Sequence, residues 1–226
     1  MIAVVDYKKG NLLSVERGLC EAGANACITA NPAKIARANA IVLPGVGAFS
    51  NAIETMRKLG QADVIKQSIN RGVPFLGICL GLHLLFDSGT EGSLSCECSG
   101  CSKPSNGLGI LDGCVCRMPK KDTQGKFHKV PHVGWNVVHQ TNDSVGRGSQ
   151  LFEGIKQDTF FYFTHSYIVP ENKYTIATAT HSTTFPCAIQ KGNCFAVQFH
   201  PEKSSDAGNK LLRNFVDVVK GVSSIK

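Results

Sequence analysis

The sequence predicts an α/β protein built on an open, mostly parallel sheet that is flanked by helices and extended by antiparallel hairpins. In the first half of the chain, short apolar runs alternate with longer helix-like segments, which is typical of βαβ units around a buried parallel sheet. In the second half, short β-type runs are separated by Gly, Asn, Pro and Asp, as in antiparallel hairpins. Three predicted strands of the first half end in glycine-containing segments, where active sites of such sheets gather.

The elements of the first half are predicted in strict alternation. We expect strands at residues 2–5, 40–43 and 74–78, and helices at residues 12–22, 52–69 and 82–86. The glycine-containing strand ends are residues 6–11, 44–47 and 77–81. In the second half, strands are expected at residues 135–138, 160–163, 174–180, 188–190 and 194–199. An amphipathic helix at residues 209–219 closes the chain.

Length and composition bound the class of protein. With 226 residues, 42% of them hydrophobic, the chain can bury one sizeable core, and we expect a single domain over residues 1–226. No apolar run approaches the roughly 20 residues of a membrane span, and the N-terminus enters a strand-like run, so we expect a cytoplasmic protein without membrane contact. The net charge of +7 is spread over separate segments, which argues against nucleic-acid binding.

The first candidate for chemistry is a cysteine between two glycines. Cys79 stands between Gly77 and Gly81, after a strand-like run and before a helix-like one, which is the pattern of a nucleophile elbow. Small neighbours allow the strained turn, the helix that follows favours a thiolate, and the N–H of Leu80 would face a developing oxyanion. Taken alone, the pattern fits a buried strand-end cysteine equally well.

A second candidate ends another predicted strand. His200 is followed by a proline and then by Glu202, which in an extended or turn conformation lies close enough to orient the imidazole. Such a pair alone is usually an ordinary surface pair, but with the elbow it predicts a Cys-His-Glu triad.

A third candidate is the glycine-rich segment after the strand at residues 40–43. Gly45, Val46 and Gly47 offer backbone N–H groups without side-chain obstruction, which suits the second half of an oxyanion hole. Val46 or Gly47 would be the donor, and Gly45 would let that peptide reorient. A plain turn is the other interpretation.

These motifs resemble the class I (triad-type) glutamine amidotransferases, and within them the glutaminase subunits that serve histidine biosynthesis. The resemblance covers nearly the whole chain. It rests on residues 6–12, 44–47, 77–81, 107–113, 131–136, 161–167 and 198–204.

The resemblance implies one flavodoxin-like glutamine amidotransferase type-1 domain that hydrolyses glutamine to glutamate and ammonia. A separate (β/α)8-barrel cyclase subunit, joined to it as a heterodimer, would use the ammonia to make imidazole glycerol phosphate and AICAR. No cofactor is required. Because free ammonia in water is protonated, a partner docked over the site is physically reasonable. We also expect low basal glutaminase activity that rises when the cyclase binds its ligand.

The resemblance also assigns roles to further residues. Cys79 is the nucleophile, and His200, oriented by Glu202, protonates the leaving nitrogen and then activates water. The residues expected to hold glutamine are His83, Glu91, His165, Ser166 and Tyr167. The residues expected to face the cyclase are Asn11, Trp135 and Lys203, the lysine as one side of an interfacial salt bridge.

The sequence departs from this family at two places. His83 stands where the family carries a glutamine that helps to fix the substrate; it either takes over that contact with a shorter reach or packs on its helix. A longer stretch, residues 93–106, is rich in cysteine, and a hairpin is expected to follow it. The thiols of this stretch and of the hairpin either bind a structural zinc or stay unligated: Cys96, Cys98, Cys101, Cys114 and Cys116.

Other functions remain open at this point. A paralogous glutaminase could supply ammonia to another synthase, for example one that amidates surface-polysaccharide sugars. A partner-independent cysteine hydrolase of peptides or γ-glutamyl compounds would need neither Trp135 nor Lys203. A non-catalytic binding module would tolerate the loss of Cys79.

Overall fold

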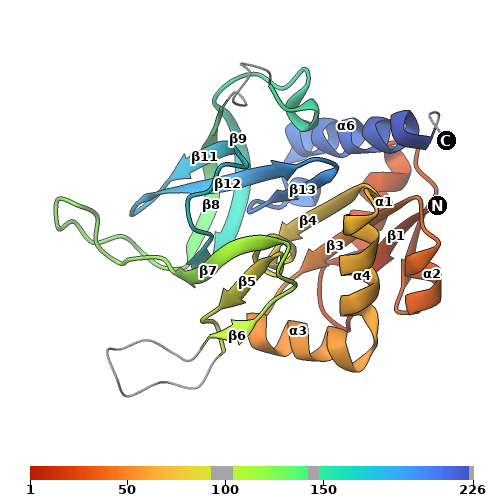
Figure 1. The fold of residues 1–226 in the computed structure, drawn as a ribbon. Coiled ribbons are helices and arrows are strands. Elements are labelled where there is room, and N and C mark those ends of the chain that lie inside the picture. The colour runs from red at the N-terminus through yellow and green to blue at the C-terminus, as the bar shows by residue number, and fades with distance from the viewer. Residues whose placement is uncertain (93–103, 142–147, 224–226) are drawn as a thin grey trace.

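The structure, a computed structural model, describes residues 1–92, 104–141 and 148–223. Within these residues, nine strands form one sheet in the order β2-β1-β3-β4-β13-β12-β11-β8-β9 (Figure 1). The strands from β2 to β13 in this order are parallel, and each later neighbour is antiparallel. The predicted fold class, a mostly parallel open sheet with antiparallel hairpins at one side, is confirmed.

The parallel half alternates strands and helices along the chain. Its strands are β1 (Ile2–Val5), β2 (Ala26–Thr29), β3 (Ala40–Gly45) and β4 (Phe75–Cys79). Its helices are α1 (Leu12–Glu21), α2 (Pro32–Ala36), α3 (Phe49–Lys58) and α4 (Gln61–Asn70). The late strand β13 (Cys194–Val197) then pairs with β4, so the carboxyl ends of β4 and β13 lie side by side.

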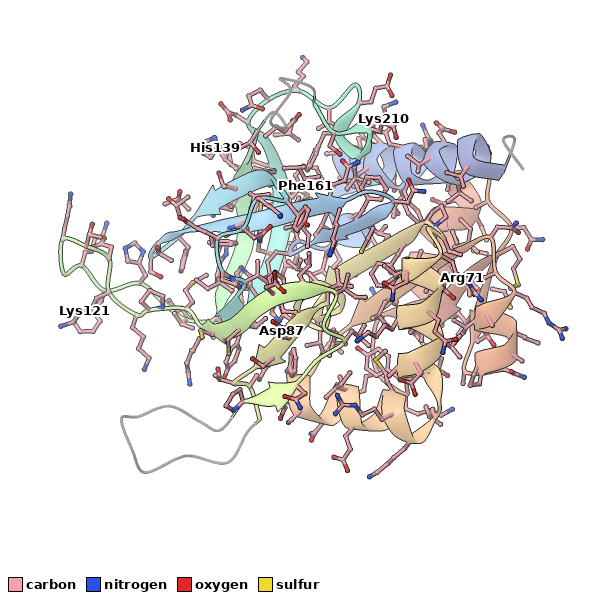
Figure 2. All side chains as sticks on the ribbon, viewed as in Figure 1. Arg71, Asp87, Lys121, His139, Phe161 and Lys210 are labelled. Atoms are coloured by element: carbon pink, nitrogen blue, oxygen red, sulfur yellow. The ribbon has the colours of Figure 1, made fainter. Side chains whose placement is uncertain are left out.

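The second half supplies the antiparallel strands and the closing helix. The strands are β8 (His132–Gln140), β9 (Thr159–His165), β11 (Thr175–Thr180) and β12 (Thr184–Lys191). Two short 3-10 helices, η1 (Gln150–Phe152) and η2 (Pro201–Lys203), precede α6 (Ser205–Ser223). Figure 2 shows Phe161 of β9 inside the molecule, where it is fully buried, and Lys121 on the projecting segment between β7 and β8.

A smaller sheet lies beside the main one. Counted over the described residues it has four strands, in the order β10-β7-β5-β6. Their bounds are β5 (Phe86–Gly89), β6 (Ser105–Asn106), β7 (Leu111–Arg117) and β10 (Tyr167–Ile168).

The main sheet buries apolar side chains on both faces. Ile2 and Val4 of β1 pack in a core with α1 and α6, whereas Ala3 and Val5 point to a second core with α2, α3 and α4. This alternation is what the period of a strand requires when helices cover both faces. Figure 1 shows the helices divided in this way.

Three details of the predicted elements were wrong. The expected helix at residues 52–69 is two helices, because Gly60 adopts a left-handed φ of 67° between α3 and α4. The expected helix at residues 82–86 is only the single turn α5 (Leu80–His83), and Phe86 begins a strand. Cys114 and Cys116 lie on β7, which pairs with β5 in parallel and with β10, so they are not part of a hairpin.

The zinc hypothesis rests largely on Cys96, Cys98 and Cys101, which lie outside the described residues. Among the residues that are described, no group of three or more His, Cys, Asp or Glu side chains is arranged to hold a metal ion. In the same part of the chain, every helix is too short or too polar to cross a membrane.

Candidate active site

Cys79 occupies a strained elbow between β4 and α5. Its φ of 53° and ψ of −106° are unusual for a residue with a side chain, and its side chain is 7% exposed. A Cβ on Gly77 would lie 2.7 Å from the Gly81 carbonyl oxygen, and one on Gly81 would collide with the Leu43 carbonyl. Both flanking residues must therefore be glycine. Because α5 is one turn long, its dipole gives the thiol less support than the sequence suggested.

His200 is held at the end of the neighbouring strand by backbone contacts. Its N–H donates to the Tyr162 carbonyl at 2.9 Å, and its own carbonyl accepts from the Ser204 hydroxyl at 2.7 Å. The Tyr162 N–H donates to that same hydroxyl at 3.0 Å. The backbone of His200 is thus fixed by β9 and by Ser204, the residue before α6.

His200 and Glu202 form a buried pair. The His200 Nδ1 and the Glu202 Oε1 lie 2.9 Å apart, and each side chain is 2% exposed. Burial alone would lower the pKa of His200, but hydrogen bonding and charge interactions with Cys79 and Glu202 outweigh it and raise the pKa to about 9. The imidazolium form is therefore favoured next to the cysteine, as in a thiolate–imidazolium pair.

The Cys79 sulfur has three polar neighbours. His200 lies close enough to interact with it, although the Nε2 makes no regular hydrogen bond to any described residue. The Thr164 carbonyl lies 3.9 Å from the Sγ and can accept the thiol hydrogen. The Gln198 side-chain amide lies 3.8 Å away and can donate to the sulfur.

The predicted oxyanion segment lies beside the elbow. Gly45 is the register partner of Cys79 across β3 and β4, and Gly47 has a φ of 100° that favours glycine. A Cβ on Gly45 would collide with the Tyr7 hydroxyl and come within 2.9 Å of the Leu80 Cβ. The segment thus passes next to Leu80, whose N–H was the other predicted donor.

Tyr7 is a buried polar residue behind this segment. Among the described residues its hydroxyl has no well-formed hydrogen bond, although the Val46 N–H lies close enough to favour the phenolate. Burial, helped by Cys79, raises the pKa of Tyr7 well above its ordinary value. The hydroxyl therefore stays protonated between the oxyanion segment and the nucleophile.

A cleft of about 390 Å³ opens in front of Cys79. The five residues predicted to hold glutamine all line it. The complete lining consists of Val46, Gly47, Ala48, Cys79, Leu80, His83, Glu91, Pro131, Thr164, His165, Ser166 and Tyr167. Such a cleft, with a nucleophile at its wall and polar groups around it, is the usual form of a small-molecule site.

Glu91 lines the cleft, and Arg117 lies close enough to act on its charge from outside the lining. Burial raises the pKa of Glu91, while the Phe49 N–H and the Arg117 guanidinium act in the opposite direction. Burial and the nearby Glu91 also raise the pKa of Tyr167. The cleft thus presents a carboxylate that could pair with an ammonium group, and a cation close by.

Two buried histidines stand at the side of the cleft. The His165 Nε2 lies 3.0 Å from the His132 Nδ1, and the His165 Nδ1 lies 2.9 Å from the Tyr167 carbonyl. Burial lowers the pKa of His165 to about 3 and that of His132 to about 4. Both rings are therefore neutral at physiological pH, and they order the segment that carries Ser166.

His83 faces a partner that the sequence reasoning missed. Its Nε2 lies 2.7 Å from the Gln198 Oε1, and both side chains are buried. Gln198 in turn reaches Cys79. A single polar residue in an otherwise apolar run, Phe195 to Phe199, was the signal that could have identified it.

The three residues predicted to face a partner lie outside the cleft. Trp135 on β8 is 53% exposed and packs edge-on to Tyr162, and the Lys203 ammonium lies over the same ring at 5.8 Å. Asn11 precedes α1, which contacts η2. The structure therefore brings Trp135 and Lys203 together around Tyr162 and places Asn11 at a neighbouring element.

The class of protein follows from comparison with known families. The family model described as "Glutamine amidotransferase class-I" matches residues 3–219, so the chain belongs to that family and is a glutamine amidotransferase. A solved structure described as a glutamine amidotransferase has a TM-score of 0.68 at 16% identity, over 97% of this chain and 100% of that one. The glutaminase domain of the Trypanosoma brucei CTPS has a TM-score of 0.63 at 15% identity, with 97% and 93% coverage. These two likenesses show the fold.

Within the family, the chain is similar to the imidazole glycerol phosphate synthase subunit HisH of several bacteria. The protein of Caldanaerobacter subterraneus is 40% identical over 97% of this chain and 99% of its own length. The Nostoc punctiforme protein is 45% identical, with 97% of each chain covered. The chain is of HisH type by this similarity.

Proposed function

We propose that this chain is the glutaminase subunit of imidazole glycerol phosphate synthase in histidine biosynthesis. It hydrolyses glutamine to glutamate and ammonia, and a (β/α)8-barrel cyclase subunit bound to it as a heterodimer uses the ammonia to make imidazole glycerol phosphate and AICAR. The proposal rests mainly on one observation: Cys79 lines the cleft and lies next to the buried His200–Glu202 pair. The HisH relatives support the choice of synthase.

The geometry supports a two-step acyl transfer at Cys79. The thiolate adds to the side-chain amide carbon of glutamine, and the negative charge passes to the amide oxygen, where backbone N–H groups can stabilise it. His200 as imidazolium gives its proton to the leaving nitrogen, ammonia departs, and a γ-glutamyl thioester remains. The neutral His200 then takes a proton from water, which cleaves the thioester and releases glutamate. Glu202 holds the ring in the required orientation.

Recognition of glutamine follows from the polar groups of the cleft. Glu91 supplies a carboxylate for the α-amino group, and the segment from His165 to Tyr167 lies across the cleft for the α-carboxylate, with Ser166 as the side-chain donor. Gly47 contributes backbone at the same place. His83 lines the cleft too, but its hydrogen bond to Gln198 makes it a support of the site as well as part of its wall.

An exposed apolar face supports docking of the cyclase. Val133, Trp135 and Phe160 are each more than half exposed, and all lie on the outward face of the β8–β9 pair. Exposed aromatic residues of this kind are typical of protein interfaces. Lys203 stands at the edge of this face, where it could form an interfacial salt bridge, and Asn11 lies nearby on the chain before α1.

The oxyanion segment supports control of the site by the partner. The Val46 N–H lies near the buried Tyr7 hydroxyl, and Gly47 gives the peptide freedom to turn. Loss of one oxyanion donor costs about 10²–10³ in rate in other acyl-transfer enzymes, so withholding this donor would keep basal activity low. We therefore expect activation when the cyclase binds its own ligand.

The family match over residues 3–219 supports one domain for the whole chain. The names of the relatives are those of a biosynthetic enzyme subunit, which supports a cytoplasmic location.

The test is glutaminase activity of the wild type and of Cys79→Ala, each alone and with the cyclase and its ligand. We expect weak activity of the free wild type, a rise of at least tenfold in the liganded complex, and none in the alanine variant. Full activity of the free subunit would contradict the proposed activation by the liganded cyclase. Glutaminase activity in Cys79→Ala would show that Cys79 is not the nucleophile.

A further inference from the structure

Gln198 is a fully buried amide in an apolar part of the chain. It directly follows β13, its backbone N–H donates to the Cys187 carbonyl at 2.8 Å, and its side chain has no exposed surface. Burying an amide is costly unless both its oxygen and its nitrogen find partners. The identity of those partners therefore says what the residue does.

Both partners belong to the elbow. The Gln198 Oε1 lies 2.7 Å from the His83 Nε2, and the Gln198 Nε2 lies 3.8 Å from the Cys79 Sγ. One side chain, that of the residue directly after β13, thus contacts both the nucleophile and the last residue of α5. The path His83–Gln198–Cys79 is buried along its whole length.

The direction of these hydrogen bonds follows from the state of His83. Burial lowers the pKa of His83 to about 4, so the ring is neutral at physiological pH. A neutral imidazole that meets a carbonyl oxygen through its Nε2 must carry its hydrogen on that nitrogen. The Gln198 oxygen is then committed to His83, and the NH₂ group faces the sulfur.

The Cys79 sulfur accepts a hydrogen bond from this donor best when it is a thiolate. A thiol can donate to the Thr164 carbonyl, 3.9 Å away, whereas a thiolate accepts only. The titratable groups around Cys79 are His200 from the end of β13, Tyr7 behind the oxyanion segment and His83 on α5. Of these, His200 stabilises the thiolate directly, and the uncharged Gln198 amide adds a donor that does not titrate.

We propose that Gln198, held in orientation by His83, is a positioning residue that donates to the Cys79 Sγ and thereby stabilises and aims the thiolate. The proposal deepens the proposed function and rests on Cys79 as the nucleophile. When the sulfur forms its bond to the amide carbon, its negative charge moves to the amide oxygen, and the donation from Gln198 weakens. Gln198 therefore acts before the bond forms, by favouring the thiolate over the thiol and by holding the sulfur in line for attack, and not on the leaving group.

The test compares Gln198→Leu, which keeps the volume but removes the donor, with Gln190→Leu on β12 as a control outside the cleft. The readouts are iodoacetamide alkylation of Cys79 at pH 7, followed on the Cys79 peptide by mass spectrometry, and the kcat and KM of the heterodimer. We expect alkylation and kcat to fall by about tenfold in Gln198→Leu with KM changed less than twofold, since a loss of about one hydrogen bond to a charged group corresponds to that factor.

A second pair of variants guards against a folding defect. His83→Leu removes the group that orients Gln198 and is expected to slow alkylation, whereas His83→Gln can still donate to the Gln198 oxygen and is expected to recover most of the rate. Wild-type alkylation and kcat in Gln198→Leu, or equal rates in the two His83 variants, would overturn the proposal. Cys79→Ala tests the proposed function separately from these results. The proposed function stands if that variant is inactive and fails if it is active.

Discussion

At the scale of single residues, the site depends on a histidine whose charged form is favoured by its surroundings. The pKa of His200 is raised to about 9 from its ordinary value of 6.5, because Cys79 and Glu202 outweigh the effect of burial. A group whose pKa is raised by folding stabilises the folded state fully at pH values below its pKa in the unfolded chain. That contribution is lost as the pH rises through its pKa in the folded protein.

The stability of the protein should therefore depend on pH through His200. In urea unfolding, the free energy of unfolding of the wild type should exceed that of His200→Gln most at pH 6.5 and below, and the difference should shrink as the pH rises toward 9 and beyond. The exposed pair of His139 and Asp158 offers His139→Gln as a control with little change (Figure 2). A difference that grows with pH would contradict the sign of the shift.

Gly45 and Tyr7 form a second testable contact at this scale. Gly45→Ala should lower stability by about 1–3 kcal/mol, because the new methyl group meets the Tyr7 hydroxyl and the Leu80 Cβ. Tyr7→Phe should cost little, since the hydroxyl has no well-formed hydrogen bond among the described residues. The double variant should recover part of the loss, which urea unfolding of all four proteins measures as a coupling free energy. Strict additivity would show that the two groups do not touch.

The sequence indicates those residues whose chemistry requires an unusual local backbone conformation or a place at a strand end. Cys79 could be predicted because the elbow requires glycine on both sides, and His200 with Glu202 because a strand ended there. The apolar run around Gln198 could have marked it as a buried polar residue, but neither Gln198 nor Tyr7 shows in the sequence which side chains it contacts in other elements. His83 was predicted as a substrate contact, and only the structure shows its hydrogen bond to Gln198.

At the scale of elements, strands and helices with clear periodicity were predicted, and short or irregular ones were not. The strands β1, β3 and β4 were located to within a residue or two, because apolar runs buried on both faces are easy to recognise. The strand β5 was missed, since its sequence, Phe86–Gly89, contains Asp, Ser and Gly and reads as a turn. Its strand character comes from pairing with β7 and β6, which are distant in the chain.

The β8–β9 pair is the element whose function is most open to test. Trp135→Ala should weaken cyclase binding by at least tenfold in titration calorimetry without lowering the melting temperature, because the side chain is exposed in the free subunit. His139→Ala is a matched control, since it lies on the same strand and the same face, four residues further along. Unchanged cyclase binding in Trp135→Ala would mean that the face near Trp135 does not make the interface.

At the scale of the whole molecule, the fold brings the ends of three parallel strands to one place. β4 supplies Cys79, β3 leads into the oxyanion segment, and β13 leads into Gln198 and His200. Glu91, which follows β5, and the segment from His165 to Tyr167, which runs into β10, complete the cleft in front of them. Covalent catalysis at Cys79 is the central claim of this arrangement.

That claim is tested most directly by looking for the acyl-enzyme. Glutamine is added to the liganded heterodimer, the reaction is quenched with acid within its first turnovers, and the peptides are analysed by mass spectrometry. We predict a γ-glutamyl thioester on the peptide that carries Cys79, and its absence in Cys79→Ala. Continued release of ammonia by Cys79→Ala, or a glutamyl adduct on a different residue of the wild type, would contradict the account.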